Sequence, residues 1–329
     1  MEEGKKMYLA PDGDELAIID AAADFLSDAM SISRLHTSAA ADLGAPLRQA
    51  LGEMGWFALS VAESSGGSGL SAVEHVLFFR EAGRQCAPLD LLAQCLAANT
   101  VMDPALRASI AGGEVGVGLM VADGGDYRIF GSPDARFGLL VTETASAIYV
   151  LEGVPSSSRC ALDPANSMRM VAELPAPLET LDGPDIWRLG QLGTAAMLIG
   201  IAEAALDQAV DYAKVRETFG RKIGSWQAVR HPCADMAVRL EAARSELWYA
   251  ATATKERRSD AEMHVNAAKH LANVAGLSNA DTNIQLHGGI GITDEHDAHL
   301  LLKHSMVLSR IFGSKRSLLS RLLDAHLEN

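Results

Sequence analysis

Apolar residues recur at helical spacing through the first third of the chain. Within residues 14–30, for example, Leu16, Ile19 and Ala23 lie close to one face of a helix. The same spacing predicts helices at residues 45–54, 73–84 and 89–99, and Ser71 is placed to cap the third of these four. We therefore expect residues 1–112 to form a helical N-terminal domain.

The pattern changes at about residue 113. Short apolar runs at residues 115–121, 138–141 and 147–151 are typical of strands, and Gly-Gly-Asp and Pro-Asp turns separate them. Several prolines interrupt the rest of this region. These features predict a small, shortened β domain at residues 113–180.

Long helical segments return in residues 181–329. Asp182 is placed to cap a first helix, with Pro184 in its first turn, that runs to about residue 214. A second helix is predicted at about residues 225–257, with a kink at Pro232. Apolar faces on long antiparallel helices are typical of a four-helix bundle.

Two more capping patterns divide the end of the chain. Ser259 and Glu262 have the spacing of a capping box for a third helix, and Thr293 is placed to cap a fourth that runs to about residue 310. Gly313 then interrupts the pattern before residues 315–327 resume it. The order of helices, strands and helices predicts an α+β fold with domains at residues 1–112, 113–180 and 181–329.

Composition limits the possible functions. The 329 residues carry a net charge of −14, which argues against a general binder of nucleic acids or membrane surfaces. Four cysteines without CxxC spacing are typical of reduced thiols. The N-terminus lacks a signal-peptide pattern, and no uninterrupted apolar run is long enough to span a bilayer. We expect a cytoplasmic protein.

Two glycine-containing motifs carry most of the chemical information. The first reads Arg-x-x-Phe-Gly-x-x-Ile-Gly-x-x-Gln-Ala-Val-x-His from Arg216 to His231, and the second reads Gln-x-x-Gly-Gly-x-Gly from Gln285 to Gly291. Glycines let a backbone approach a ligand closely, and the planar fork of arginine suits phosphate. Together and in this order, the two motifs resemble those of the acyl-CoA dehydrogenase family of flavoenzymes.

The resemblance implies a helix–sheet–helix architecture and a flavin adenine dinucleotide (FAD) cofactor at a subunit boundary. In the family, both motifs reach across to the diphosphate and adenine of the neighbouring subunit's cofactor. By this resemblance, Arg216 pairs with the diphosphate and Phe219 packs beside the cofactor. Further amide and backbone contacts are implied for Gln227, Gln285, Gly288 and Gly289.

Plainer interpretations exist for several of these residues. Arg216 could be a solvated cation at a helix end, and Gly288 and Gly289 could cap a helix. The Gly/Ser-rich segment near Gly67 does not fit a phosphate-binding loop, so we expect a structural loop there. No cysteine joins the four nearby histidines, and we expect no metal site among His287, His296, His299 and His304.

The family's catalytic base is missing. Removing the α proton of an acyl thioester requires a positioned carboxylate, and the family places it at one of two positions. Gly313 occupies the first, in the segment similar to Tyr-Glu-Gly-Thr, and the second falls at about Gly190. Asp185 lies off the helical face that carries Gly190. We therefore predict no catalytic residue in this chain.

The β domain also lacks the family's flavin-contacting segments. Neither the Thr-Glu-Pro-Gly-Ala-Gly-Ser-Asp loop nor the Trp/Tyr-Ile-Thr-Asn stretch is present. The chain thus resembles the short, base-lacking subunit of heteromeric acyl-CoA dehydrogenases that act on steroid side chains. The implied partners are an acyl-CoA substrate, a longer homologue in a heterotetramer and an electron-accepting flavoprotein.

Two other interpretations stay open. The chain could form a self-sufficient homo-oligomeric acyl-CoA dehydrogenase with an unconventional base. It could also be a non-enzymatic helical assembly protein that has lost the flavin. Retention of FAD by the purified chain distinguishes the last interpretation from the other two.

Overall fold

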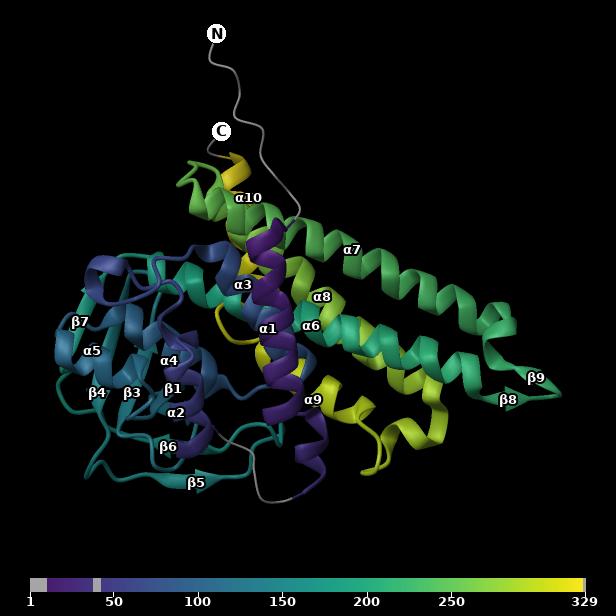
Figure 1. Cartoon of the computed structure of the whole chain (residues 1–329), viewed down its shortest axis with the longest axis horizontal. Helices are drawn as coiled ribbons and strands as arrows, with labels where there is room; N and C mark the ends of the chain where they lie inside the picture. Colours follow the sequence, from purple (N-terminus) through teal and green to yellow (C-terminus); the bar gives the residue numbers. More distant parts are fainter. Residues whose placement is uncertain (1–10, 38–42, 328–329) are drawn as a thin grey trace, which may run out of the picture.

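The computed structural model describes residues 11–37 and 43–327. Figure 1 shows a sheet with short helices packed beside it, and three long helices that extend away from the sheet to the opposite end of the molecule. This arrangement confirms the predicted α+β fold, with an N-terminal helical part, a small central sheet and a C-terminal helical part. The residue boundaries of the three domains stay a prediction.

The N-terminal part contains five α-helices, within the residues that the structure describes. Two of them begin with a capping box, in which the cap side chain and a glutamate three residues later bond each other's backbone N–H groups. Asp12 and Glu15 form the first box, and Ser71 and Glu74 form the second. The helices are α1 (Gly13–Ala29), α2 (Ala45–Glu53), α3 (Ala72–Arg84), α4 (Leu89–Thr100) and α5 (Pro104–Ala111).

The Gly/Ser-rich segment before α3 is a structural loop. Its backbone N–H groups are used inside the protein, because Gly67 donates to Ala62, Ser68 to Ala58 and Gly69 to Val61. These amides are therefore not free to bind a phosphate, which agrees with the prediction of a structural loop.

The sheet has seven strands in the order β5-β6-β2-β1-β3-β4-β7. Alternate residues of β1 face two different clusters: Leu119 packs in the main core, and Met120 packs with Ile129 and Val171 in a smaller one. The strands are β1 (Val117–Asp123), β2 (Asp126–Phe130), β3 (Phe137–Val141), β4 (Ala145–Val150), β5 (Ser157–Arg159), β6 (Met168–Val171) and β7 (Glu179–Asp182). Sequence patterning located β1, β3 and β4, whereas the exposed β5 and β7 lack an apolar run.

The C-terminal part is organised around α6 (Asp185–Val215), which packs against α3, α7 (Gln227–Lys255) and α8 (Ala261–His287). This helix is long and apolar enough to cross a membrane, but 89% of its most apolar window is buried inside the fold. It is therefore the core helix of the bundle. Two shorter helices follow, α9 (Ala298–Leu308) and α10 (Lys315–Leu327).

Three predicted caps in this region are wrong. Pro184, not Asp182, precedes α6, and Asp260 precedes α8 without any side-chain cap. A short 3₁₀ segment at Gly288–Ile292 ends beside Thr293, so α9 begins only at Ala298. Tertiary packing of the buried faces positions these helix starts more strongly than a local capping pattern does. Helix α7 continues through Pro232.

Candidate functional site

The first motif forms a hairpin at the far end of the bundle, on the right of Figure 1. Helix α6 ends at Val215, and Glu217–Thr218 (β8) pairs with Arg221–Lys222 (β9). The two residues between the strands, Phe219 and Gly220, have φ angles of 51° and 74°. Positive φ at both positions is the geometry of the tightest hairpin turns, which explains a glycine in the second position.

The second motif lies beside this hairpin because α8 ends next to the end of α6. The Tyr212 ring stacks on the His287 ring with centroids 4.4 Å apart. Asn283 Nδ2 donates to Gln208 Oε1 at 2.8 Å. Gly288 then caps α8 with a φ of 64°. The tip, defined as residues 216–227 and 285–289, therefore collects both motifs at one end of the molecule.

The tip offers unused hydrogen-bond donors to solvent. Phe219 is 94% exposed. The side chains of Arg216, Gln227 and Gln285 are exposed, and within the described residues none of them has an intramolecular partner. A free guanidinium and free amides at the same end of the molecule form a donor set that suits a diphosphate. The helix-end position of Arg216 and the capping role of Gly288 are both present, and both are compatible with a ligand.

The histidines near the tip have structural contacts. The ring of His296 lies 4.2 Å from that of His287, measured between centroids. The fully buried His304 Nδ1 bonds Asp163 Oδ2 at 2.6 Å and so ties α9 to the loop before β6. Over residues 11–37 and 43–327, no group of three or more His, Cys, Asp or Glu side chains is arranged to hold a metal ion.

A second region lies at the other end of α6. A cavity of about 540 Å³, called here the cleft, opens between the sheet and the C-terminal helices. It is lined by residues 119–122, 140–144, 187 and 310–313, so Gly313 is part of its wall. Most of the lining is apolar, and Glu143 and Arg310 are the charged residues in it.

The space beside Gly190 is filled by an aromatic side chain. A Cβ atom on Gly190 would lie 2.5 Å from two ring carbons of Phe312. The Phe312 ring is 5% exposed and meets the Trp187 ring edge-on, with centroids 5.3 Å apart. Phe312 and Gly313 both have positive φ, 55° and 126°. Phe312 belongs to the segment similar to Tyr-Glu-Gly-Thr, but the sequence pattern indicated neither its contact with Gly190 nor a place for Trp187 in this region.

A buried lysine holds this part of the chain. Lys269 Nζ donates to the carbonyl of Leu308 at 2.9 Å and to Asn273 Oδ1 at 3.0 Å, and Asn273 Nδ2 donates to the carbonyl of Gly313 at 3.3 Å. Complete burial lowers the pKa of Lys269 well below its ordinary value. On the sheet side, Glu143 forms an ion pair with Arg321 of α10. Both ends of the segment between α9 and α10 are therefore fixed to neighbouring elements.

The tip and the cleft are far apart in one chain. Gly190 lies near the start of α6, and Arg216 directly follows the last residue of this helix. They are 26 positions apart, which corresponds to roughly 40 Å along the helix. That separation exceeds the breadth of about 30 Å of a small domain. The donors of the tip therefore cannot serve the cleft of the same chain.

Comparison with known proteins agrees with this architecture. Residues 12–109 match the profile of the acyl-CoA dehydrogenase N-terminal domain, and residues 188–326 match that of the C-terminal domain. Acyl-CoA dehydrogenase IpdE2 of Mycobacterium tuberculosis is 32% identical over 277 residues, which cover 82% of this chain and 83% of the relative.

Two further comparisons show how much of a longer relative this chain covers and how closely its fold matches a solved structure. Acyl-CoA dehydrogenase FadE34 of M. tuberculosis is 33% identical over 305 residues, but this chain spans only 42% of its length. The ChsE4–ChsE5 complex from M. tuberculosis contains a chain that superimposes with a TM-score of 0.81 at 22% identity, covering 98% of this chain and 100% of that one. The two domain matches and the identity to IpdE2 show that the chain belongs to the acyl-CoA dehydrogenase family.

Proposed function

We propose that this chain is the supporting subunit of an FAD-dependent acyl-CoA dehydrogenase, and that it completes the flavin site of a longer catalytic partner. The assembly removes hydrogens from the α and β carbons of an acyl-CoA thioester, with a bulky, steroid-type side chain as the preferred substrate. The chain itself supplies no catalytic base.

The observation that carries this proposal is the packing of Phe312 against Gly190. Neither residues 311–314, which are similar to the family's Tyr-Glu-Gly-Thr segment, nor Gly190 carries a carboxylate. A side chain at Gly190 would collide with the Phe312 ring at 2.5 Å, and one at Gly313 would be strained by a φ of 126°. This packing supports the proposal that the chain supplies no base.

The tip supplies the other half of the proposal. The donor set of Arg216, Gln227 and Gln285 fits a diphosphate, and its distance from the chain's own cleft directs it to a neighbour's cofactor. When bound, FAD accepts the hydride from the β carbon. In this proposal Arg216 neutralises diphosphate charge with its bidentate fork, and Phe219 covers an apolar part of the cofactor and excludes water. The partner's carboxylate removes the α proton.

The names of the relatives are compatible with a mixed assembly. ChsE4–ChsE5 is a complex of two differently named proteins, and one of its chains has the fold described above. IpdE2, of similar length to this chain, is named an acyl-CoA dehydrogenase. We extend both properties to this chain as part of the proposal.

The test is purification from the native cell followed by counting flavins and chains. We expect two copies of this chain with two copies of a longer homologue, and one flavin per unlike pair. Changing the base of the partner to glutamine should abolish dehydrogenation, whereas Gly313→Glu in this chain should create no second working site. One flavin per chain in an active homo-oligomer would contradict the proposal.

One observation favours a second candidate, the self-sufficient enzyme. Glu143 lines the cleft and is the carboxylate among the lining residues, so it is the available candidate for an unconventional base. Its ion pair with Arg321 engages that carboxylate and makes this role the weaker one. Glu143→Gln separates the two: activity of the isolated chain that is lost in this variant would establish Glu143 as the base.

A further inference from the structure

A pocket lies between α6 and α7 on the face that α8 does not cover. Gln208 and Tyr212 of α6 contact α8, whereas Val210, two residues from each, lines the pocket. Residues two apart on a helix point in nearly opposite directions, since each residue turns the helix by about 100°. The pocket is therefore on the opposite side of α6 from α8 and from the second motif.

The pocket exists because α3 ends too early to fill it. Helix α3 packs along α6 and contacts α7, and Arg84 in its last turn donates to Asp207 at 2.7 Å and to Glu203 at 3.4 Å. Beyond Asp207 the space between the two long helices is open and holds about 390 Å³. Lys222 and Gly224, at the base of the hairpin, close its far end.

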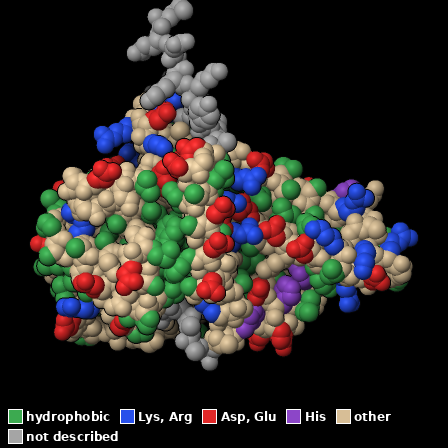
Figure 2. All heavy atoms as spheres, in the orientation of Figure 1, with side chains coloured by type: hydrophobic (Ala, Val, Ile, Leu, Met, Phe, Trp, Pro, Cys, Tyr) green, Lys and Arg blue, Asp and Glu red, His purple; other side chains and the backbone are tan. Residues whose placement is uncertain are grey.

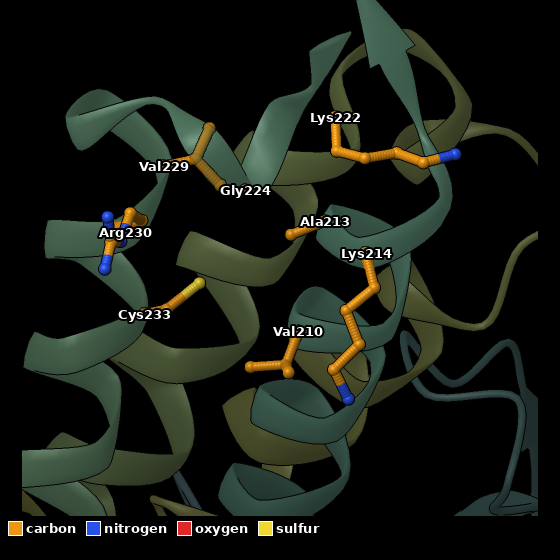
Figure 3. Close-up of a pocket in the computed structure, with 8 residues that line it drawn as sticks. All are labelled: Val210, Ala213, Lys214, Lys222, Gly224, Val229, Arg230 and Cys233. Carbon is orange, nitrogen blue, oxygen red and sulfur yellow. The ribbon is translucent and has the colours of Figure 1, made fainter.

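The walls of the pocket are aliphatic and its edge is cationic. In Figure 3, Val210 and Ala213 approach from α6, and Cys233 points from α7 into the space between the helices. Figure 2 shows Lys and Arg side chains gathered at this end of a molecule that is acidic overall. The composition of the pocket is therefore that of a site for an apolar group with a negative charge attached.

The three cations at the edge differ in availability. Lys214 is paired with Asp211 at 2.9 Å, and Lys222 with Glu217 at 2.7 Å. Arg230 has no side-chain partner among the residues described, and it stands one helical turn from Cys233. An unpaired guanidinium beside an aliphatic space can bind a carboxylate with two parallel hydrogen bonds.

We propose that this pocket binds an aliphatic monocarboxylate. The hydrocarbon chain lies between Val210 and Cys233, and the carboxylate pairs with Arg230. The volume falls in the range of about 300–1,000 Å³ that is usual for small-molecule sites, and a mostly apolar lining with one orienting charge is their usual composition. None of the six residues assigned to the cofactor lines the pocket, although Lys222 and Gly224 of the tip close its far end.

The reactivity of the Cys233 thiol can be used to measure whether a ligand occupies the pocket. The four cysteines are free: Cys86 and Cys95 are buried, Cys160 is exposed and Cys233 is half-buried. In a Cys160→Ser background of the full chain, N-ethylmaleimide reacts at Cys233, and the rate is measured with increasing sodium decanoate. We expect saturable protection of at least about fivefold, and clearly weaker protection by decanol, which has the chain without the charge.

Two variants and one control variant distinguish binding in the pocket from a general effect of the ligand on the protein. Arg230→Gln should weaken decanoate about tenfold and leave decanol unchanged, as expected for the loss of one charge-assisted pair. Arg316→Gln, an exposed arginine on α10, is the matched control and should change neither. Val229→Trp keeps Arg230 but fills the space, so it should abolish protection by both ligands.

Several results would overturn the proposal. Equal protection by decanol and decanoate would show that Arg230 does not bind the carboxylate. Absence of protection at millimolar decanoate would show that the pocket does not bind an aliphatic monocarboxylate. If Cys233 is protected only when the longer homologue is added, the pocket is a surface for that protein and the monocarboxylate assignment is wrong.

Discussion

The two ends of α6 differ in whether the residues singled out by the sequence are exposed or packed against other parts of the chain. At the tip, the side chains that resemble a cofactor site are exposed and have no partners within the described chain. At the cleft, Gly190 is buried and Phe312 packs directly over it, whereas Gly313 is half-buried in the cleft wall. The proposed function accounts for this contrast, because groups that contact another molecule must stay free, whereas a region without a catalytic role can be filled by the protein's own core.

The same difference predicts opposite responses to substitution. A change at the tip should alter binding and leave the folded chain intact, because exposed groups without partners contribute little to folding. A change at the cleft should alter stability and leave cofactor contacts intact. The following predictions test this contrast, from the largest effect to the smallest.

Gly190→Glu should destabilise the fold most. The new side chain collides with the Phe312 ring and buries a carboxylate without a partner, which together should lower the free energy of unfolding by about 3–5 kcal/mol. Urea denaturation of the purified chain measures this. Gly289→Ala at the tip, where a Cβ atom meets nothing within 4 Å, is the control and should change stability by less than about 0.5 kcal/mol. Equal effects would show that the two regions do not differ as described.

Arg216→Ala should affect binding instead of folding. Loss of a charge-assisted contact to the diphosphate should weaken flavin retention in the assembled complex about tenfold to hundredfold. Arg216→Lys should restore only part of the affinity, because lysine lacks the bidentate fork. Flavin release on dilution is the measurement. Unchanged release in the alanine variant would remove Arg216 from the site.

Lys269→Met should change how stability depends on pH. Because burial lowers the pKa of Lys269 in the folded state, unfolding takes up a proton at pH values between that lowered pKa and the ordinary value of 10.5, so stability rises with pH across this window. The slope contributed by one such group is at most about 1.4 kcal/mol per pH unit. Denaturation of both proteins between pH 7 and 9 should show a smaller rise in the variant. Parallel curves would mean that Lys269 keeps its proton when buried.

Gly220→Ala should have the smallest effect. Alanine at a φ of 74° costs about 1 kcal/mol, and its Cβ atom would meet nothing within 4 Å, so the strain is confined to the turn itself. We expect a slight loss of flavin retention and little change in the midpoint of urea unfolding. A loss as large as that of Arg216→Ala would mean that the hairpin shape, and not the arginine, determines the contact.

Local sequence determined the helix–sheet–helix order, the strands β1, β3 and β4, and the two motifs of the tip. These features depend on neighbours in the chain: apolar periodicity specifies a helix face, and Phe219-Gly220 specifies a tight turn. The caps predicted at Asp182, Ser259 and Thr293 failed because packing of the long helices, not the first turn, decides where they begin.

Only the tertiary structure decided what surrounds Gly190 and Gly313. The sequence shows a glycine at positions 190 and 313, but a glycine alone does not distinguish an empty site from a filled one. The contact of Phe312 with Gly190 joins segments that are distant in sequence, and the bonds from Lys269 to the end of α9 do the same. The pocket beside Arg230 likewise depends on where α3 stops relative to α6 and α7. Such contacts follow from how elements pack in space, which no local pattern encodes.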